Sequence, residues 1–229
     1  ALSCYNQGGR VDKCIEIAQM AMAGGRIDAV LEGIARKAAE KEGAKGEVQA
    51  ITARMEELLS SQTSGEDAQT AWYYAFGAKE AGKALSWANK AYAADPNSLT
   101  VKSLLIYALV INGQGDVAGE MVKELGDRAE SDQIVKLAMG VKLLAEQKKD
   151  DAVAALKRAI DIRPDTIEAA EARDLLAYNG ESYSGIDEKM TSDITGELKT
   201  IYGEDIMPQW MSPDKIVSLK LISRMESDP

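Results

Sequence analysis

Apolar residues recur every three or four positions along most of this 229-residue chain, which is the spacing of one face of an α-helix. Between residues 46 and 61, for example, Val48, Ile51, Met55 and Leu59 share one helical face. Glycines, prolines and short polar runs interrupt the pattern at short intervals. The pattern therefore predicts an all-α protein built from short amphipathic helices.

A longer period is superimposed on the helical one. The stretches 90–96 and 158–164 both read as a basic residue, alanine, four further residues and proline. Pro96 and Pro164 are 68 positions apart, twice 34, and a spacing of 34 gives consecutive units 65–98, 99–132 and 133–166. The same position of each unit holds Ala84, Ala118 and Ala152. We therefore predict three structural repeats.

Each unit reads as two helices separated by a short turn. The turns are predicted near residues 81–82, 112–115 and 147–150, where glycine or charged residues break the apolar pattern. Small residues at fixed positions let the two helices of a pair approach closely. Pro96 and Pro164 are expected to end second helices, because proline cannot continue the helical hydrogen bonds.

These units resemble the tetratricopeptide repeat (TPR), a helix pair of about 34 residues. The sequence keeps the period, the alanine column and the two prolines, and Gly140 matches the family's glycine in the third unit only. The family's early tryptophan and the aromatic residue of its second helix are replaced. The resemblance covers residues 65–166 and implies a right-handed α-α superhelix, a TPR-like solenoid of helix pairs.

The resemblance also implies a binding surface, because in this family the first helix of each unit lines a concave groove that binds peptides. The family's clamp of lysine, asparagine and arginine around a terminal carboxylate is not matched. The corresponding positions predict a mostly apolar groove for a peptide or protein segment, lined by Gln69, Tyr73, Phe76, Ser103, Tyr107, Val110, Leu137, Val141 and Leu144. The other interpretation is that Tyr73, Tyr107 and Leu137 form the core between repeats.

The segments on either side of the repeats are also helical in pattern. Residues 1–64 predict helices near 11–23, 26–42 and 46–61, which we interpret as degenerate repeats that extend and cap the array. Residues 167–229 begin with a helix that ends near Asn179-Gly180 and continue as an acidic helical extension. That extension either caps the last repeats, occupies the groove or docks on a second protein.

Charge is distributed unevenly along the chain. The formal net charge is −10, of which residues 1–64 carry −1, residues 65–166 carry −2 and residues 167–229 carry −7. We do not expect nucleic-acid binding, because the repeats offer no basic stripe to neutralise phosphates. The longest apolar run, 104–111, is far shorter than the roughly 20 residues that cross a bilayer, so no transmembrane segment is expected.

Residues with catalytic potential are few. The absence of histidine removes the commonest general base and the commonest metal ligand. Cys4 and Cys14 are either free thiols or a single bridge, and two thiols alone do not make a zinc site. The adjacent carboxylates at 56–57 and 150–151 point in different directions on a helix and do not converge on one atom. We therefore expect no catalytic residues, no metal and no cofactor.

The repeats and the lack of catalytic chemistry predict a non-enzymatic scaffold or adaptor whose partner is another protein or peptide. Self-assembly through repeat edges or the C-terminal extension is the alternative, and a helical-repeat enzyme or glycan binder is a third. A cytoplasmic location is favoured. Because the sequence begins with Ala1 and not with Met, a periplasmic or exported protein whose signal was removed is the other possibility.

Overall fold

The computed structural model describes residues 29–61, 67–164, 166–183 and 185. The chain divides into two compact units, Ala1–Glu181 and Ser182–Pro229, and every helix described below belongs to the first. The predicted helix at 11–23, both cysteines and nearly all of the C-terminal extension lie outside the described residues. None of the helices described is long and apolar enough to cross a membrane.

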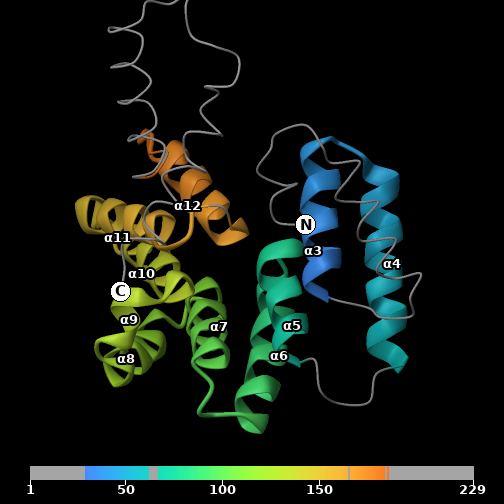
Figure 1. Ribbon diagram of the computed structural model, residues 1–229, viewed down its shortest axis with the longest axis horizontal. Helices are drawn as coiled ribbons and strands as arrows, with labels where there is room; N and C mark the ends of the chain where they lie inside the picture. Colours follow the sequence, from blue (N-terminus) through green and yellow to red (C-terminus); the bar gives the residue numbers. More distant parts are fainter. Residues whose placement is uncertain (1–28, 62–66, 165, 184, 186–229) are drawn as a thin grey trace, which may run out of the picture. The chain divides into compact units, whose positions relative to one another are not determined.

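The described residues form helices joined by short turns, and no strand occurs among them, which confirms the all-α prediction for this part of the chain (Figure 1). In chain order the elements are α3 (Ala29–Lys41), α4 (Lys45–Ser61), α5 (Asp67–Trp72), the π-helical turn η1 (Tyr73–Gly77), α6 (Ala81–Ala94), α7 (Leu99–Ile111), α8 (Gly115–Leu125), α9 (Arg128–Ser131), α10 (Gln133–Ala145), α11 (Lys149–Ile162) and α12 (Ile167–Tyr178).

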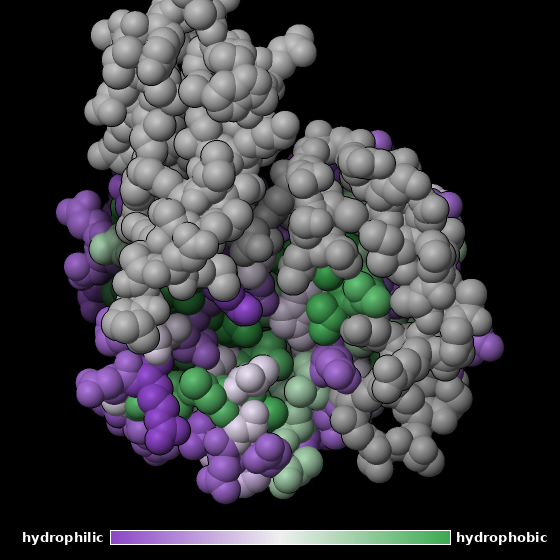
Figure 2. Space-filling model, in the orientation of Figure 1, coloured by the Kyte–Doolittle hydropathy of each residue, from purple (hydrophilic) through white to green (hydrophobic). Residues whose placement is uncertain are grey.

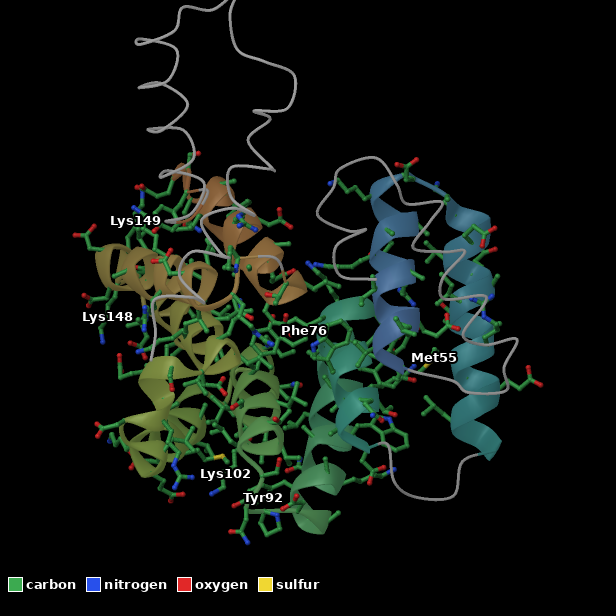
Figure 3. All side chains as sticks on the ribbon, viewed as in Figure 1. Met55, Phe76, Tyr92, Lys102, Lys148 and Lys149 are labelled. Carbon is green, nitrogen blue, oxygen red and sulfur yellow. The ribbon has the colours of Figure 1, made fainter. Side chains whose placement is uncertain are left out.

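Helices α3 and α4 lie in two of the stretches predicted to be helical and form an antiparallel pair (Figure 1). Ala35 and Ala39 of α3 pack against Ile51 of α4, and Met55 is buried between the two helices (Figure 3). Arg54 of α4 donates to both carboxylate oxygens of the buried Glu32, at 3.3 and 3.0 Å. A carboxylate inside a helix pair is stable only with such a partner.

Three further helix pairs follow within the ranges 65–98, 99–132 and 133–166, and they share a pattern of helix starts. Ser98, Asp132 and Thr166 are spaced by the period of 34, and each precedes the first residue of α7, α10 or α12. The side chain of each accepts a hydrogen bond from the backbone N–H three residues later. Such N-caps satisfy backbone donors that the helix itself leaves unpaired. The last residue of one unit therefore starts the first helix of the next.

The turns between the two helices of each pair also share a recurring position. Lys79, Gly113 and Gln147 are spaced by the same period, and all three have positive φ, at 55°, 76° and 60°. After Gly113 and Gln147 the next backbone N–H bonds to a carbonyl five residues earlier, with N···O distances of 2.9 Å in both. This is the Schellman arrangement, in which a left-handed residue closes the end of a helix. Glycine adopts that conformation without strain, whereas lysine and glutamine do not.

The helices of each pair meet at small residues. Ala84, Ala118 and Ala152 are completely buried, as expected where helices approach closely. At Gly140 of α10 a Cβ atom would lie 2.6 Å from Cδ2 and 2.7 Å from Cγ of Leu156 on α11. At Gly77 of η1 a Cβ atom would lie 2.6 Å from Cα of Gly33, so α3 and η1 touch through their backbones.

Helix α7 lies at the centre of the described helices. All residues from Ser103 to Val110 are buried, so this helix has no exposed face over two turns. It contacts α5, α6, α8 and α10, and Figure 1 shows it between the α5–α6 pair and the α10–α11 pair. A helix that is apolar on all sides belongs to the interior of a protein.

Replacing Gly140 by alanine is expected to lower the free energy of unfolding by about 1–2 kcal/mol. The new methyl group would overlap Leu156, and this overpacking outweighs the better helix propensity of alanine. Urea denaturation followed by circular dichroism measures the change. Gly119→Ala in α8 is the control, because its Cβ atom would meet one atom at an ordinary 3.8 Å and should leave stability equal or higher. Equal gains at both positions would contradict the packing at Gly140.

Replacing Gln147 by glycine is expected to raise the free energy of unfolding by about 0.5–1 kcal/mol, because glycine adopts φ of 60° without strain. The same denaturation experiment measures it. Gln69→Gly inside α5, where φ is not positive, should instead lose about 1 kcal/mol. A loss of stability at both positions would mean that the positive φ of Gln147 does not destabilise the protein.

Candidate functional site

The nine side chains predicted to line a groove do not form one open surface. The buried ones are Tyr73, Phe76, Ser103, Tyr107, Val110 and Leu137. Val141 and Leu144 are half-buried, and Gln69 is exposed. The structure thus places Tyr73, Tyr107 and Leu137 in the interior, which is the second of the two interpretations. The groove as a binding site for a peptide remains a prediction.

The buried aromatic residues pack on one another. Phe76 of η1 stacks on Tyr107 of α7, with 4.5 Å between ring centroids and 22° between planes. Trp72 lies beside Phe76 at 5.5 Å, with its ring tilted by 43°. Figure 3 shows Phe76 in the middle of the described helices. Contacts of this kind hold the first helices of the first and second units together.

Two of the predicted polar side chains bind to neighbouring helices. The Tyr73 hydroxyl accepts a 3.4 Å hydrogen bond from Nη1 of Arg36 on α3, and the same nitrogen donates at 2.7 Å to Thr52 on α4. Burial raises the pKa of Tyr73, so its phenol stays protonated. Oγ of Ser103 lies 2.9 Å from the carboxylate of Asp132, which caps α10. Both side chains therefore serve the packing of the helices.

Helix α12 contacts elements that are far away in the sequence. Nζ of Lys37 on α3 donates to Glu171 of α12 at 2.8 Å, and Nζ of Lys79 donates to the other oxygen of Glu171 at 3.1 Å. One turn earlier, Nε1 of Trp72 donates to the buried carboxylate of Glu168 at 2.7 Å. These pairs are 134, 92 and 96 residues apart in the chain. Figure 1 shows the first turn of α12 pointing toward α3 and α5.

The contacts of Glu171 with Lys37 and Lys79, which we call the junction of α12 with α3 and the turn after η1, determine the protonation state of Glu171. Burial by itself would raise the pKa of Glu171, but the ammonium groups of Lys37 and Lys79 outweigh burial and lower that pKa below its ordinary value. Glu171 is therefore ionised at neutral pH. The neighbouring phenol of Tyr107 responds in the opposite sense, since burial and then the charges of Glu171 and Glu168 raise its pKa.

An open cleft of about 500 Å³ borders this junction. It is lined by Lys37, Glu40, Lys41, Lys79, Ala170, Arg173 and Asp174. Ammonium, guanidinium and carboxylate groups form the strong, charge-assisted class of hydrogen bonds with ligands of opposite charge. On the face shown in Figure 2, hydrophobic surface lies toward the middle and hydrophilic side chains lie toward the left and lower edges. We take this cleft as the candidate site.

A second, smaller cleft brings two of the predicted groove residues together. It has a volume of about 220 Å³ and lies where α7 and α10 meet the turn into α8. Its lining residues are Val110, Gly113, Gly115, Asp116, Val141, Lys142, Ala145 and Glu146. Lys142 and Glu146 form an ion pair across one turn of α10 beside it.

The charged residues of the junction were not among the predicted site residues. One signal could have found Glu171, because one further step of the repeat period places it in the column of Gln69, Ser103 and Leu137. Lys79 occupies the turn column of Gly113 and Gln147. No sequence pattern identifies Lys37, whose partner stands 134 residues later.

The described residues contain no group of three or more histidine, cysteine, aspartate or glutamate side chains that could hold a metal ion. Comparison of the chain with protein-family models, with curated proteins and with solved structures gives no match.

Replacing Glu171 by glutamine is expected to lower the free energy of unfolding by about 3 kcal/mol at neutral pH, because the buried Lys37 loses its carboxylate partner. The pKa of Glu171 is lower in the folded protein than in the unfolded chain. Its contribution is thus fully present above the ordinary pKa of 4.5 and disappears as the pH falls through the folded value.

Urea denaturation of both proteins from neutral pH down to about pH 3 measures this difference. The wild-type and Glu171→Gln curves should converge as the pH falls. Glu120→Gln on α8 is the control, since Glu120 pairs with Lys123 at an exposed site and should change stability by less than about 1 kcal/mol. A difference that stays constant over the whole pH range would rule out the ionised Glu171 as its source.

Proposed function

We propose that this chain is a non-catalytic helical-repeat adaptor of the TPR-like type, and that it binds a segment of another protein in the cleft bordered by α3 and α12. The N-caps and left-handed turns, which both recur with the period of 34, support the repeat architecture. A right-handed superhelix of helix pairs is part of this proposal.

The observation that carries the proposal is the cleft itself. Its walls come from α3 and α12, which lie on either side of the three predicted repeats in the sequence, and charged side chains from both helices line it. Repeat proteins offer extended surfaces because each repeat contacts mainly its neighbours. Here the interior aromatic residues are occupied by packing, so the accessible chemistry lies at the charged cleft.

The predicted concave residues then have two roles. Phe76, Tyr107 and Leu137 hold the first helices together. Gln69 is exposed, and Val141 and Leu144 are half-buried, so these three remain available as contacts for a long partner segment. A bound segment that begins in the charged cleft is therefore proposed to make its specific contacts there.

Self-association is a second candidate function. Among the described residues, Val117 on α8 and Tyr178 at the end of α12 are large hydrophobic side chains with 52% and 91% of their surface exposed. Exposed apolar side chains of this size favour contact with another surface. Light scattering at two protein concentrations distinguishes this function, because an adaptor that does not self-associate keeps the same mass at both.

Site-specific photo-crosslinking tests the adaptor proposal. A photoreactive phenylalanine analogue placed at Asp174, which lines the cleft, is expected to crosslink one partner protein in the cells that produce this chain. The same analogue at Val117 on α8, outside the cleft, is the control and should not capture that partner. Capture from Val117 alone would place the binding surface elsewhere, and crosslinked dimers from Val117 would support self-association.

A further inference from the structure

We infer that a polar clasp holds helix α12 over the buried aromatic side chains, and that it opens as one unit and then connects the cleft to them. The clasp consists of the junction, in which Glu171 binds Lys37 and Lys79, and of the bond from Trp72 to Glu168. The clasp itself does not depend on the adaptor proposal. Its role as a gate, which admits a partner segment from the cleft to Trp72, rests on that proposed function.

The three donors of the clasp belong to one group of helices. Lys37 lies on α3, Trp72 ends α5, and Lys79 follows η1 in the turn before α6. Helix α3 packs on α5 and η1, and it touches η1 through the backbone, because a Cβ atom on Gly77 would lie 2.6 Å from Cα of Gly33. Elements packed this closely move little relative to one another. The three donors therefore move together.

Both acceptors of the clasp belong to a second group of helices. Glu168 and Glu171 lie one turn apart on α12, and α12 packs on α10 and α11. Oγ1 of Thr166, the N-cap of α12, donates at 2.9 Å to the side-chain oxygen of Gln133 on α10. The apolar side chains of α12 that are completely buried are Ile167, Ala169, Ala172 and Leu176. The two carboxylates therefore move with α10 and α11.

The bonds between the two groups break together. They join Nζ of Lys37, Nζ of Lys79 and Nε1 of Trp72 to carboxylate oxygens of α12, at 2.8, 3.1 and 2.7 Å. A displacement of α12 away from α3 and α5 lengthens all three bonds. Buried ion pairs add little net stability, because desolvation offsets most of their attraction. The open state is therefore a minor state of the folded protein, and α12 keeps its packing on α10 and α11 in it.

The clasp closes over aromatic side chains, two of which are predicted groove residues. Trp72 is 8% exposed, and Phe76 and Tyr107 stack behind it and are also buried. Burial and then the charges of Glu171 and Glu168 raise the pKa of Tyr107, so both carboxylates lie close to its phenol. Both lysines of the clasp line the cleft. Opening of the clasp therefore extends the cleft toward Trp72 and offers an aromatic contact to an apolar side chain of a bound segment.

The repeat fold does not require the groups that form the clasp. The period of 34 places Glu171 at the position of Ser103 and Leu137, which are uncharged and completely buried. The π-helical turn η1, between Trp72 and Lys79, is a second departure, because α7 and α10 are regular α-helices at the same place in their units. Such π-helical turns are rare and occur frequently at functional sites. Both departures from the repeat thus meet at the clasp.

Exchange of the indole N–H of Trp72 with solvent tests the inference, measured by NMR on the nitrogen-15-labelled full chain. The indole bound to Glu168 is protected while the clasp is closed, so its exchange rate reports the open population. Glu171→Gln is expected to raise this rate about tenfold, although the bonds of Glu171 are to the two lysines. Trp72→Phe assigns the signal. The indole of Trp87, which is covered by Lys90, is the internal control and should exchange at the same rate.

A second variant keeps the test decisive if Glu171→Gln folds poorly. Lys79→Gly relieves the positive φ and removes one bond of the clasp, so it should fold and raise the exchange rate of the Trp72 indole about threefold. Gln147→Gly is the matched control, since it relieves the same φ in the third unit and should leave the rate unchanged. In Lys79→Gly the backbone N–H of the buried Ala152 should not exchange faster, which separates opening of the clasp from global unfolding.

An unchanged exchange rate of the Trp72 indole in a folded Glu171→Gln, or in Lys79→Gly, would overturn the clasp. The gate is tested by crosslinking from Asp174, where Glu168→Gln should raise the yield of the partner about threefold, because it weakens the bond to Trp72 and changes no residue that lines the cleft. An equal or lower yield would overturn the gate. If Asp174 captures no partner from either protein, the adaptor proposal fails, and the exchange rates still decide whether the clasp opens.

Discussion

The contact of Glu171 with two lysines joins helices from opposite ends of the described chain. Its carboxylate joins α12 to α3 and to the turn after η1, across 134 and 92 residues of chain. Helical repeats are otherwise held by contacts between neighbours. Together with the bond from Trp72 to Glu168, this contact keeps the first turn of α12 beside the first helices of the array. The aromatic side chains there become interior, and a charged cleft remains at the border.

A buried ion pair of this kind is weak evidence for stability, because desolvation of the charges offsets most of their attraction. Apolar residues of similar volume would join the same helices as well. What an ion pair adds is selectivity of position, since Glu171 is satisfied only where both ammonium groups can reach it. In this protein the selected position leaves an opening of about 500 Å³ beside the pair. The same charges thus orient α12 and line the candidate site.

The local structure could be predicted from the period, and the role of the concave positions could not. Breaks in the apolar pattern correctly place the turns near Gly113 and Gln147. They place the first turn at 81–82, which is wrong, because α6 begins at Ala81 and the turn lies at Lys79. A period shows which positions share a column, but not whether that column faces water or another helix. The continuous apolar run 104–111 was the available signal for a buried α7. The pairing of Lys37 with Glu171 has no local signature in a single sequence.

The three residues with positive φ in the turns show which property the fold requires and which the side chain adds. The backbone has positive φ at Lys79, Gly113 and Gln147, and glycine adopts this conformation with the least strain. At Lys79 the side chain forms an ion pair with Glu171 at 3.1 Å. The side chain of Gln147 forms no hydrogen bond or ion pair with the described residues. Two residues with the same left-handed conformation therefore differ in what their side chains bind.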